Sequence, residues 1–379
     1  MLQQIIDFVQ SALLYSLPYL GVLAVVIFIH EMGHFLVARW CGVKVLTFSM
    51  GFGPELWHRF DKHGTRWRLA AVPLGGYVKF YGDENAASAP ARDKLAKMSA
   101  KERRLSFSGQ PVLKRSAIVA AGPIANFILT IAIFAGTFYF VGRPITVAQV
   151  DRVAEGSAAQ KAGFQVRDLI LAIDGSTIES FSDMQRIVRI SPDRTLNFRV
   201  LRDGREIDVQ ATPQRQEVKD VFGQVHRIGI IGISRSEAAG DVRHKNYGLG
   251  EALVAGVQET WFVVDRTFDY IGGVITGRES ADQISGPIRI AQVSGQAAKL
   301  GFDVLLNLTA VLSVSIGLLN LFPIPLLDGG HLLYYAIEAV RGRPLSEKAQ
   351  EFGFRIGIAL VLTLMLFATW NDILSFNRS

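Results

Sequence analysis

The chain has 379 residues, of which 49% are apolar and 20% are charged, and its formal net charge is +6. This length allows two or three domains, and the composition predicts a membrane protein with a sizeable water-soluble part. The single cysteine, Cys41, excludes an intramolecular disulfide and a thiolate metal cluster. Residues 39–115 hold 15 Lys and Arg against 6 Asp and Glu, whereas residues 142–303 hold 20 against 21. Because the basic excess is confined to one loop, we expect no nucleic-acid binding.

The first of four segments that are apolar and long enough to span a bilayer lies within residues 1–40. The N-terminus lacks the basic region and cleavage site of a removable signal peptide, so we expect this segment to be retained as a helix. It carries His30, Glu31 and His34 among apolar residues (VVIFIHEMGHFL). Ionisable groups at such depth are energetically unfavourable and usually mark a functional site.

His30 and His34 are four positions apart, so a helix presents both from one face, where they can share a metal ion. The pattern His-Glu-x-x-His on a helix is typical of zinc metallopeptidases, in which the glutamate, here Glu31, is the general base. On a solvated helix the same spacing can reflect charge pairing alone. Within an apolar segment, three unpaired polar groups favour the metal site.

The loop over residues 41–115 contains a predicted β-hairpin (ELWHRFDKHGTRWRLAAVPLGGYVKF). Its turn falls at residues 61–64 between aromatic and branched residues. Gly75 and Gly76 indicate a bend or a close approach of the backbone. The polar residues 84–104 predict a linker or a surface helix.

A second span is expected over residues 116–141, followed by a compact α+β module over residues 142–235. Four strands (ITVAQV, DLILAIDG, TLNFRVLR and EIDVQATP) and a short amphipathic helix (SFSDMQRIVRI) are predicted there. Asp203-Gly204 predicts a hairpin turn, and residues 221–234 predict a further short strand pair.

Residues 236–303 form the next region, within which residues 248–276 are apolar but interrupted by charged side chains. A fifth span there would place the two termini on opposite sides of the membrane. We therefore expect an amphipathic helix lying at the membrane surface.

The third span is expected over residues 304–331, and its end reads NLFPIPLLDGGH. Pro323 and Pro325 break this helix, which is tolerated at such depth where the backbone lines a cavity. A loop over residues 332–353 and a fourth span with its tail over residues 354–379 complete the chain. The fold class is thus a multi-span α-helical membrane protein, with four transmembrane helices, a β-hairpin and an inserted α+β domain.

The distribution of Lys and Arg predicts the orientation of these spans. The basic loops over residues 39–115 and 332–353 should face the cytoplasm. Both termini and residues 142–303 should then lie on the other side, which in a bacterial inner membrane is the periplasm.

A catalytic zinc takes three protein ligands and leaves one position for water, so a third ligand is needed from another segment. Asp328 lies at the same end of its span as His30 and can meet it at a similar depth. Two alternatives remain at this point: Asp328 can belong to a helix-ending Asp-Gly turn, and His331 is a rival ligand.

The chain resembles the site-2 protease family of intramembrane zinc metalloproteases, in its regulator-of-sigma-E branch. HEMGH in a first span, NLFPIPLLDGGH in a third span and a soluble module between spans two and three carry the resemblance. Further matching stretches are PLGGYVKFYG, RSAIVAAGPIANF and SGPIRIAQVSGQAA. Together they cover nearly the whole chain.

The resemblance implies that His30, His34 and Asp328 bind Zn²⁺ and that Glu31 is the catalytic base. For six further residues, the resemblance implies either contact with the substrate or a place beside the active site. That set comprises Asn320 and Pro323 in the Asn-x-x-Pro stretch, Gly122 and Asn126 in the second span, and Gly75 and Gly76 of the hairpin. As alternatives, Gly122 starts a helix, Asn126 bonds across helices, and the hairpin is purely cytosolic.

The resemblance further implies that the hairpin pairs with an unwound substrate by β-strand addition. The α+β module resembles a PDZ domain, with backbone amides near Gly163 and Phe164 capturing a carboxy terminus. Relatives often have two such modules, whereas this chain has one clear module. This departure argues against a scheme in which substrates are filtered by two PDZ pockets.

The implied function is cleavage of single-span membrane proteins in regulated intramembrane proteolysis, as part of a stress response. The implied partners are the lipid bilayer, a membrane anti-sigma factor already trimmed by a first-site protease, and remnant signal peptides. The alternative function is a membrane-anchored PDZ scaffold with a structural or vestigial metal site. Closure of the metal shell by a fourth protein ligand would favour the scaffold, whereas the presence of Glu31 favours the enzyme.

Overall fold

The computed structural model divides the chain into two compact units. A helical unit contains Met1–Ala135 and Leu253–Leu374, and an α+β unit contains Gly136–Ala252 and Ser375–Ser379. The expected module over residues 142–235 falls within the second unit. The residues that the structure describes are 2–82, 98–219, 225–235, 242–277, 280–281 and 284–376.

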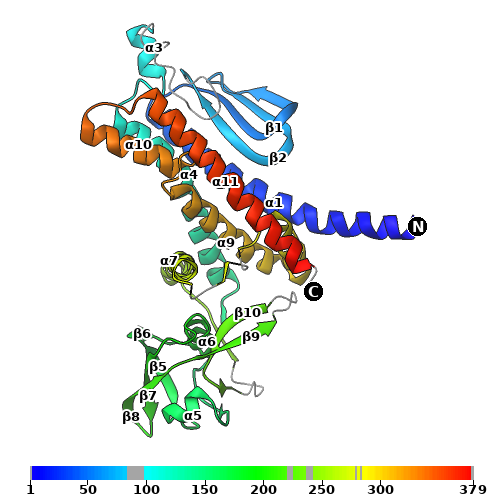
Figure 1. The fold of residues 1–379 in the computed structure, drawn as a ribbon, viewed down its shortest axis with the longest axis vertical. Helices are drawn as coiled ribbons and strands as arrows, with labels where there is room; N and C mark the ends of the chain where they lie inside the picture. The colour runs from blue at the N-terminus through cyan, green and yellow to red at the C-terminus, as the bar shows by residue number, and fades with distance from the viewer. Residues whose placement is uncertain are drawn as a thin grey trace. The chain divides into compact units, whose positions relative to one another are not determined.

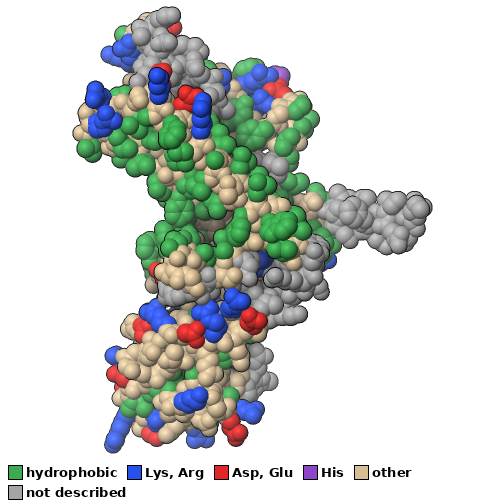
Figure 2. All heavy atoms as spheres, in the orientation of Figure 1, with side chains coloured by type: hydrophobic (Ala, Val, Ile, Leu, Met, Phe, Trp, Pro, Cys, Tyr) green, Lys and Arg blue, Asp and Glu red, His purple; other side chains and the backbone are tan. Residues whose placement is uncertain are grey.

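Within the described residues, four helices are long and apolar enough to cross a membrane, α1 from Leu14 onward. They lie in the four segments expected from the sequence, but the third ends at Leu321, ten residues before the expected bound of 331. Figure 1 shows these helices, and Figure 2 shows hydrophobic side chains over their outer surface, as a bilayer environment requires. The four are α1 (Leu2–Trp40), α4 (Val112–Phe140), α9 (Phe302–Leu321) and α11 (Glu347–Phe376).

Three further helices of more than ten residues lie among the described residues outside these four spans. The helix expected over residues 248–276 is present as α7 (Leu249–Ile275), and it is not one of the four candidate spans. Two helices were not predicted, α8 (Pro287–Leu300) and α10 (Asp328–Arg341), so the expected loop over residues 332–353 is in large part helical.

The start of α8 is stabilised by a residue far away in the sequence, which explains why it was missed. Asp372 of α11 is buried, and its carboxylate accepts hydrogen bonds from the amides of Gly286, Ile288 and Arg289 at 2.8–3.1 Å. The first amides of a helix need such acceptors, which usually come from a neighbouring N-cap side chain. Here the N-cap is Gly286, which has none.

The predicted β-hairpin is confirmed as β1 (Val45–Phe60) and β2 (Arg66–Phe80), which pair in antiparallel register. Aromatic side chains of the two strands pack the hairpin against α1. Phe48 stacks on Trp67 with centroids 4.5 Å apart, and Phe35 of α1 meets both edge to face. This packing fixes β2 alongside the helix that carries the HEMGH sequence.

The hairpin turn falls at residues 61–64, as expected, and the Asp61 carboxylate holds it. Burial raises the pKa of the Asp61 carboxyl, but hydrogen bonds from the Thr65 amide, the Trp67 indole and the His63 amide outweigh this and lower it to about 2. Arg39 of α1 pairs with the same carboxylate. Of the predicted linker over residues 84–104, residues 84–97 lie outside the described part, and α3 (Ala100–Leu105) follows.

The α+β unit is built on an antiparallel sheet in the order β6-β5-β7-β8. Asp203 and Gly204 join β7 to β8 with φ of 49° and 79°, the positive angles that a two-residue hairpin turn requires. The predicted amphipathic helix is present as α6 (Phe181–Arg189). The strands of the sheet are β5 (Leu169–Ile173), β6 (Ser176–Thr177), β7 (Leu196–Arg202) and β8 (Arg205–Ala211).

Shorter strands pair away from this sheet. The strand pair predicted for residues 221–234 is wrong in its partners, because β10 pairs with β9 and β11 pairs with β4. Its first residues, 221–224, lie outside the described part. The remaining elements are β3 (Arg143–Thr146) with its partner β12 (Val242–Lys245), β4 (Arg152–Val153), β9 (Gln214–Lys219), β10 (Val225–Ile230), β11 (Ile233–Ser234) and α5 (Ala158–Ala162).

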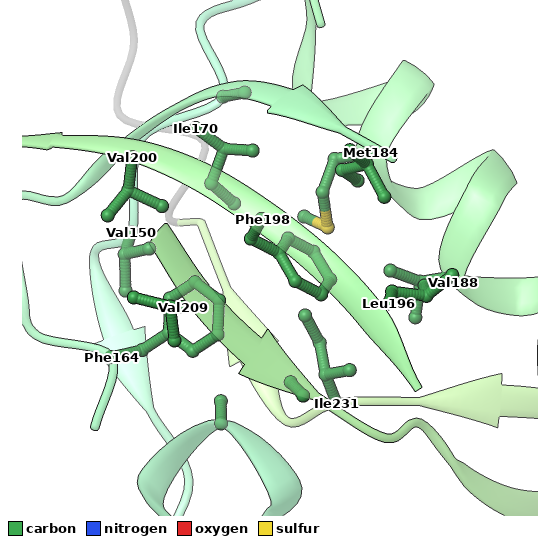
Figure 3. Close-up of a cluster of buried hydrophobic side chains, with 14 of the residues drawn as sticks. Val150, Phe164, Ile170, Met184, Val188, Leu196, Phe198, Val200, Val209 and Ile231 are labelled. Atoms are coloured by element: carbon green, nitrogen blue, oxygen red, sulfur yellow. The ribbon is translucent and has the colours of Figure 1, made fainter. Parts of the chain in front are cut away.

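One hydrophobic cluster fills the α+β unit (Figure 3). Phe198 of β7 lies at its centre, fully buried, and meets Phe164 edge to face with centroids 5.2 Å apart. Met184 and Val188 of α6 cover the same cluster. The alternation of buried and exposed residues along β7 (Leu196–Arg202) is the pattern of a strand with one face on the core.

A buried ion pair ties the loop before β5 to the sheet. Asp168 is 1% exposed, and Arg202 donates to both of its carboxylate oxygens at 2.7 and 2.6 Å. Arg202 also donates to the carbonyl of Gly163, and the amide of Gln165 donates to Asp168. The pair therefore fixes the loop around residues 163–168.

We expect Arg202→Ala to lower the free energy of unfolding of this unit by about 3 kcal/mol, because it leaves the Asp168 carboxylate buried and unpaired. Denaturant-dependent proteolysis of the full chain in detergent measures this. The double variant Asp168→Ala/Arg202→Ala has no orphan charge and should lose less. Equal losses in the single and double variants would contradict the interpretation.

Candidate metal centre

Two elements bring three ligating side chains together in the helical unit. His30 and His34 lie one turn apart on α1, and Asp328 lies in the first turn of α10. Nε2 of His30 is 3.2 Å from Nε2 of His34 and 3.1 Å from Oδ2 of Asp328, and Nε2 of His34 is 3.5 Å from that oxygen. The three residues expected to bind an ion are thus brought together, with ligand atoms within 4.8 Å of one another, a spacing at which they could hold one.

This arrangement fits zinc. Three atoms that carry lone pairs face one another, which is unfavourable unless a cation or a proton lies between them. Tetrahedral zinc with bonds of about 2.0–2.1 Å sets its ligand atoms roughly 3.3 Å apart, close to the spacings found here. Oδ2 of Asp328 is buried and makes no conventional hydrogen bond. Two imidazoles and one carboxylate are also a ligand set that zinc commonly takes in catalytic sites.

The orientation of both histidine rings is set from α4. Nδ1 of His34 lies 2.9 Å from the carbonyl of Ile118, so it must carry the proton and donate, which leaves Nε2 free to bind a metal. Nδ1 of His30 lies 3.4 Å from the side-chain amide of Asn126. Asn126 is on α4 and is fully buried.

Glu31 lines the same pocket as the three ligands and is close enough to interact electrostatically with all of them. The pocket has a volume of about 230 Å³, which is room for several water molecules or a stretch of peptide. Strand β2 passes beside it: a Cβ on Gly76 would lie 3.0 Å from Cγ of Glu31. The residues that line the pocket are His30, Glu31, His34, Gly76, Tyr77, Val78, Phe80, Val119, Asn320, Leu326, Asp328, His331 and Tyr335.

Gly122 of α4 makes room for the two rings. A Cβ at this position would lie 2.3 Å from Nε2 of His34 and 2.8 Å from Nε2 of His30. Both distances are far below a van der Waals contact, so any side chain here would displace the ligand atoms. The glycine is therefore required by the metal centre rather than by its own backbone conformation.

The structure places the other expected site residues in two groups. Asn320 and Gly76 line the pocket, and the Asn320 amide donates to the Ile316 carbonyl within α9. Gly122 and Asn126 lie behind the histidines. Pro323 is exposed, and neither it nor Gly75 is among the residues that line the pocket.

Some features of the site gave no usable signal in the sequence. Ile118 acts through its backbone carbonyl, which any residue possesses. Tyr335 lines the pocket one helical turn beyond His331, in a stretch that was expected to be a loop. Leu326 also lines the pocket and has φ of 110°, a strained value for a residue with a side chain. Strain of this kind is found at functional sites.

The sequence profile of the family described as Peptidase family M50 matches residues 18–364, which contain the whole metal centre. The chain belongs to peptidase family M50. The resemblance to site-2 proteases is thus confirmed, and the chain is a peptidase. Its four apolar helices and this family make it an integral membrane protein.

Individual relatives match over nearly their full length. A protein of Agrobacterium fabrum (strain C58) is 53% identical over 361 residues, which cover 95% of this chain and 96% of the relative. One of Mesorhizobium japonicum is 48% identical, over 94% and 97%. Both carry names beginning "Putative zinc metalloprotease". The protein named "Metalloprotease MmpA" of Caulobacter vibrioides is 41% identical, over 93% and 94%.

We expect Gly122→Ala to weaken metal binding by about 10- to 100-fold, because the new methyl group displaces both imidazoles. Competition with a chromophoric chelator on the purified protein measures this. Gly136→Ala is the matched control on the same helix, since a Cβ there meets nothing within 4 Å. Equal affinities for the two variants would contradict the assigned role of Gly122.

Proposed function

We propose that this M50 peptidase uses zinc to cleave the transmembrane segments of single-span proteins. The observation that carries the proposal is the convergence of His30, His34 and Asp328 on one pocket with Glu31, among helices apolar enough to lie in a bilayer. Zinc is supported by this ligand set and by the printed names of the relatives. Peptide bonds within a membrane are out of reach of a soluble protease.

The chemistry divides between the metal, a general base and a residue that holds the substrate. Zinc, when bound, supplies Lewis acidity that makes water a nucleophile near neutral pH. Glu31 accepts the proton from the attacking water and can pass it to the leaving amine. Asn320 lies at the pocket wall, where its side chain can hold the substrate backbone.

The hairpin is suited to holding an unwound substrate. A transmembrane helix hides each carbonyl in a hydrogen bond, so the segment to be cut must first become extended. Strands β1 and β2 form a two-stranded sheet, and β2 reaches the pocket at Gly76. An extended substrate can therefore add to the sheet by backbone hydrogen bonds with little demand on sequence. The ring of Phe52 packs over Gly75, the residue that precedes Gly76 in β2.

The α+β unit acts, in this proposal, as a PDZ-like filter on the periplasmic side. The amides of Gly163 and Phe164 donate to the carbonyls of Gln160 and Ala159, at 3.1 and 3.0 Å. They are thus engaged within the unit rather than available to a carboxylate. This favours exclusion of bulky substrates by size over capture of a free carboxy terminus.

The proposed setting is the bacterial inner membrane, with both termini in the periplasm and the basic loops in the cytoplasm. A first-site protease would trim the substrate before it reaches this enzyme. An anti-sigma factor of a stress response and remnant signal peptides are the proposed substrates. Their support is the family and the clustering of basic residues in one loop.

One observation favours the second candidate function, a membrane-anchored scaffold with a structural metal. His331 lies three residues after Asp328 and lines the same pocket, so it could complete a closed shell. A closed shell leaves no position for water.

We expect Glu31→Gln to bind zinc as the wild type does but to cleave a labelled single-span substrate about 10²- to 10⁴-fold more slowly, since the general base is lost. The measurement is the rate of cleavage by purified protein in mild detergent, alongside the zinc content. A chelator should abolish wild-type cleavage, and added zinc should restore it. If wild type and variant both hold zinc and neither cuts a trimmed substrate, the scaffold replaces the enzyme.

A further inference from the structure

Asn126 has no part in the chemistry described so far. Its side chain is 0% exposed on α4, and Nδ2 is 3.4 Å from Nδ1 of His30. Its other amide atom, Oδ1, is buried without a hydrogen-bond partner. A buried amide oxygen left unpaired is unfavourable by about 1–3 kcal/mol. Such a group calls for an explanation.

The state of the His30 ring decides which of the two amide groups should face it. With Nδ2 of Asn126 donating, Nδ1 of His30 must be the acceptor and Nε2 carries the proton, facing Asp328. That tautomer cannot bind a metal through Nε2. The metal-binding tautomer carries its proton on Nδ1 and needs an acceptor beside it, as His34 has in the carbonyl of Ile118.

The Asn126 amide can provide that acceptor without any movement of the backbone. Turning the planar amide by about 180° exchanges two groups of nearly equal size and brings Oδ1 to Nδ1 of His30. The residue itself is held in place from α9, because the hydroxyl of Ser313 donates to the Asn126 carbonyl at 3.0 Å. Gly317 of the same helix packs against its Cβ. Only the amide is free to turn.

We propose that Asn126 is a positioning residue for the metal centre: its Oδ1 accepts the Nδ1 proton of His30 and holds that ring in the tautomer that binds zinc. Asn126 thus acts through His30 and does not contact the substrate, whereas the family resemblance had placed it beside the substrate. The inference rests on the zinc-peptidase function proposed above. It also assigns both ring-orienting acceptors, Ile118 and Asn126, to α4.

Two variants of the full-length protein separate the acceptor from the volume of the side chain. Asn126→Leu has a similar shape and no acceptor, and it should weaken zinc affinity about 10- to 100-fold in competition with a chromophoric chelator. Asn126→Asp keeps an oxygen facing Nδ1 and should stay within about threefold of the wild type. Activity of Asn126→Leu should also recover when free zinc is raised, which a folding defect would not do.

Gly136→Ala is the matched control, since it changes the same helix at a position where a Cβ meets nothing within 4 Å. Its zinc affinity should equal that of the wild type. Should Asn126→Leu fail to fold, Asn126→Ala takes its place with the same expectation.

Equal zinc affinity of Asn126→Leu and wild type, or equal losses in the Leu and Asp variants, overturns the assignment of Asn126 alone. A wild-type protein that binds no zinc overturns the proposed function as well. The two failures are therefore distinguishable.

Discussion

The structure depends on one electrostatic constraint, the convergence of two imidazole nitrogens and a carboxylate oxygen in an apolar helix bundle. These atoms lie 3.1–3.5 Å apart. Without a cation or protons between them, their lone pairs would repel in a medium that screens charge poorly. The bundle therefore contains a site at which a cation or protons must lie between the three atoms. The packing of α1 against α4, the break after α9 and the position of α10 all serve this requirement.

Helix α4 makes the site possible although it contributes no ligand. Gly33 of α1 packs against the backbone of Ala121, and Gly122 gives the imidazoles their space. Close approach of helices at small residues is common in membranes, where packing rather than hydrophobicity drives association. The same approach brings the Ile118 carbonyl within reach of His34. Small residues thus set both the helix spacing and the orientation of a ligand.

The sequence predicts well those features that depend on local chemistry. The HEMGH spacing places two ligands on one helix face, Asp203-Gly204 makes its hairpin turn, and Asp61 closes the longer hairpin. The four apolar segments also appear as helices, although the third ends at Leu321 rather than at residue 331. In each case the residues that specify the feature lie within a few positions of one another.

Features that depend on distant residues are missed. Helix α8 begins at amides that are satisfied by Asp372, more than 80 residues away. Ile118 orients His34 through a backbone atom with no sequence signal. For Gly122 the sequence leaves a helix start as an alternative to a place beside the active site, and its contact with both histidine rings appears in the structure alone. Asp328 is the expected third ligand and His331 its rival, and among the described residues Asp328 is the one whose carboxylate lies within 4.8 Å of both histidine nitrogens.

The most direct measurement is X-ray absorption at the zinc edge of the purified protein. The account predicts two imidazoles and two oxygen donors, one from Asp328 and one exchangeable, with the spectrum unchanged in His331→Ala. A third imidazole that disappears in that variant would contradict the open, catalytic centre.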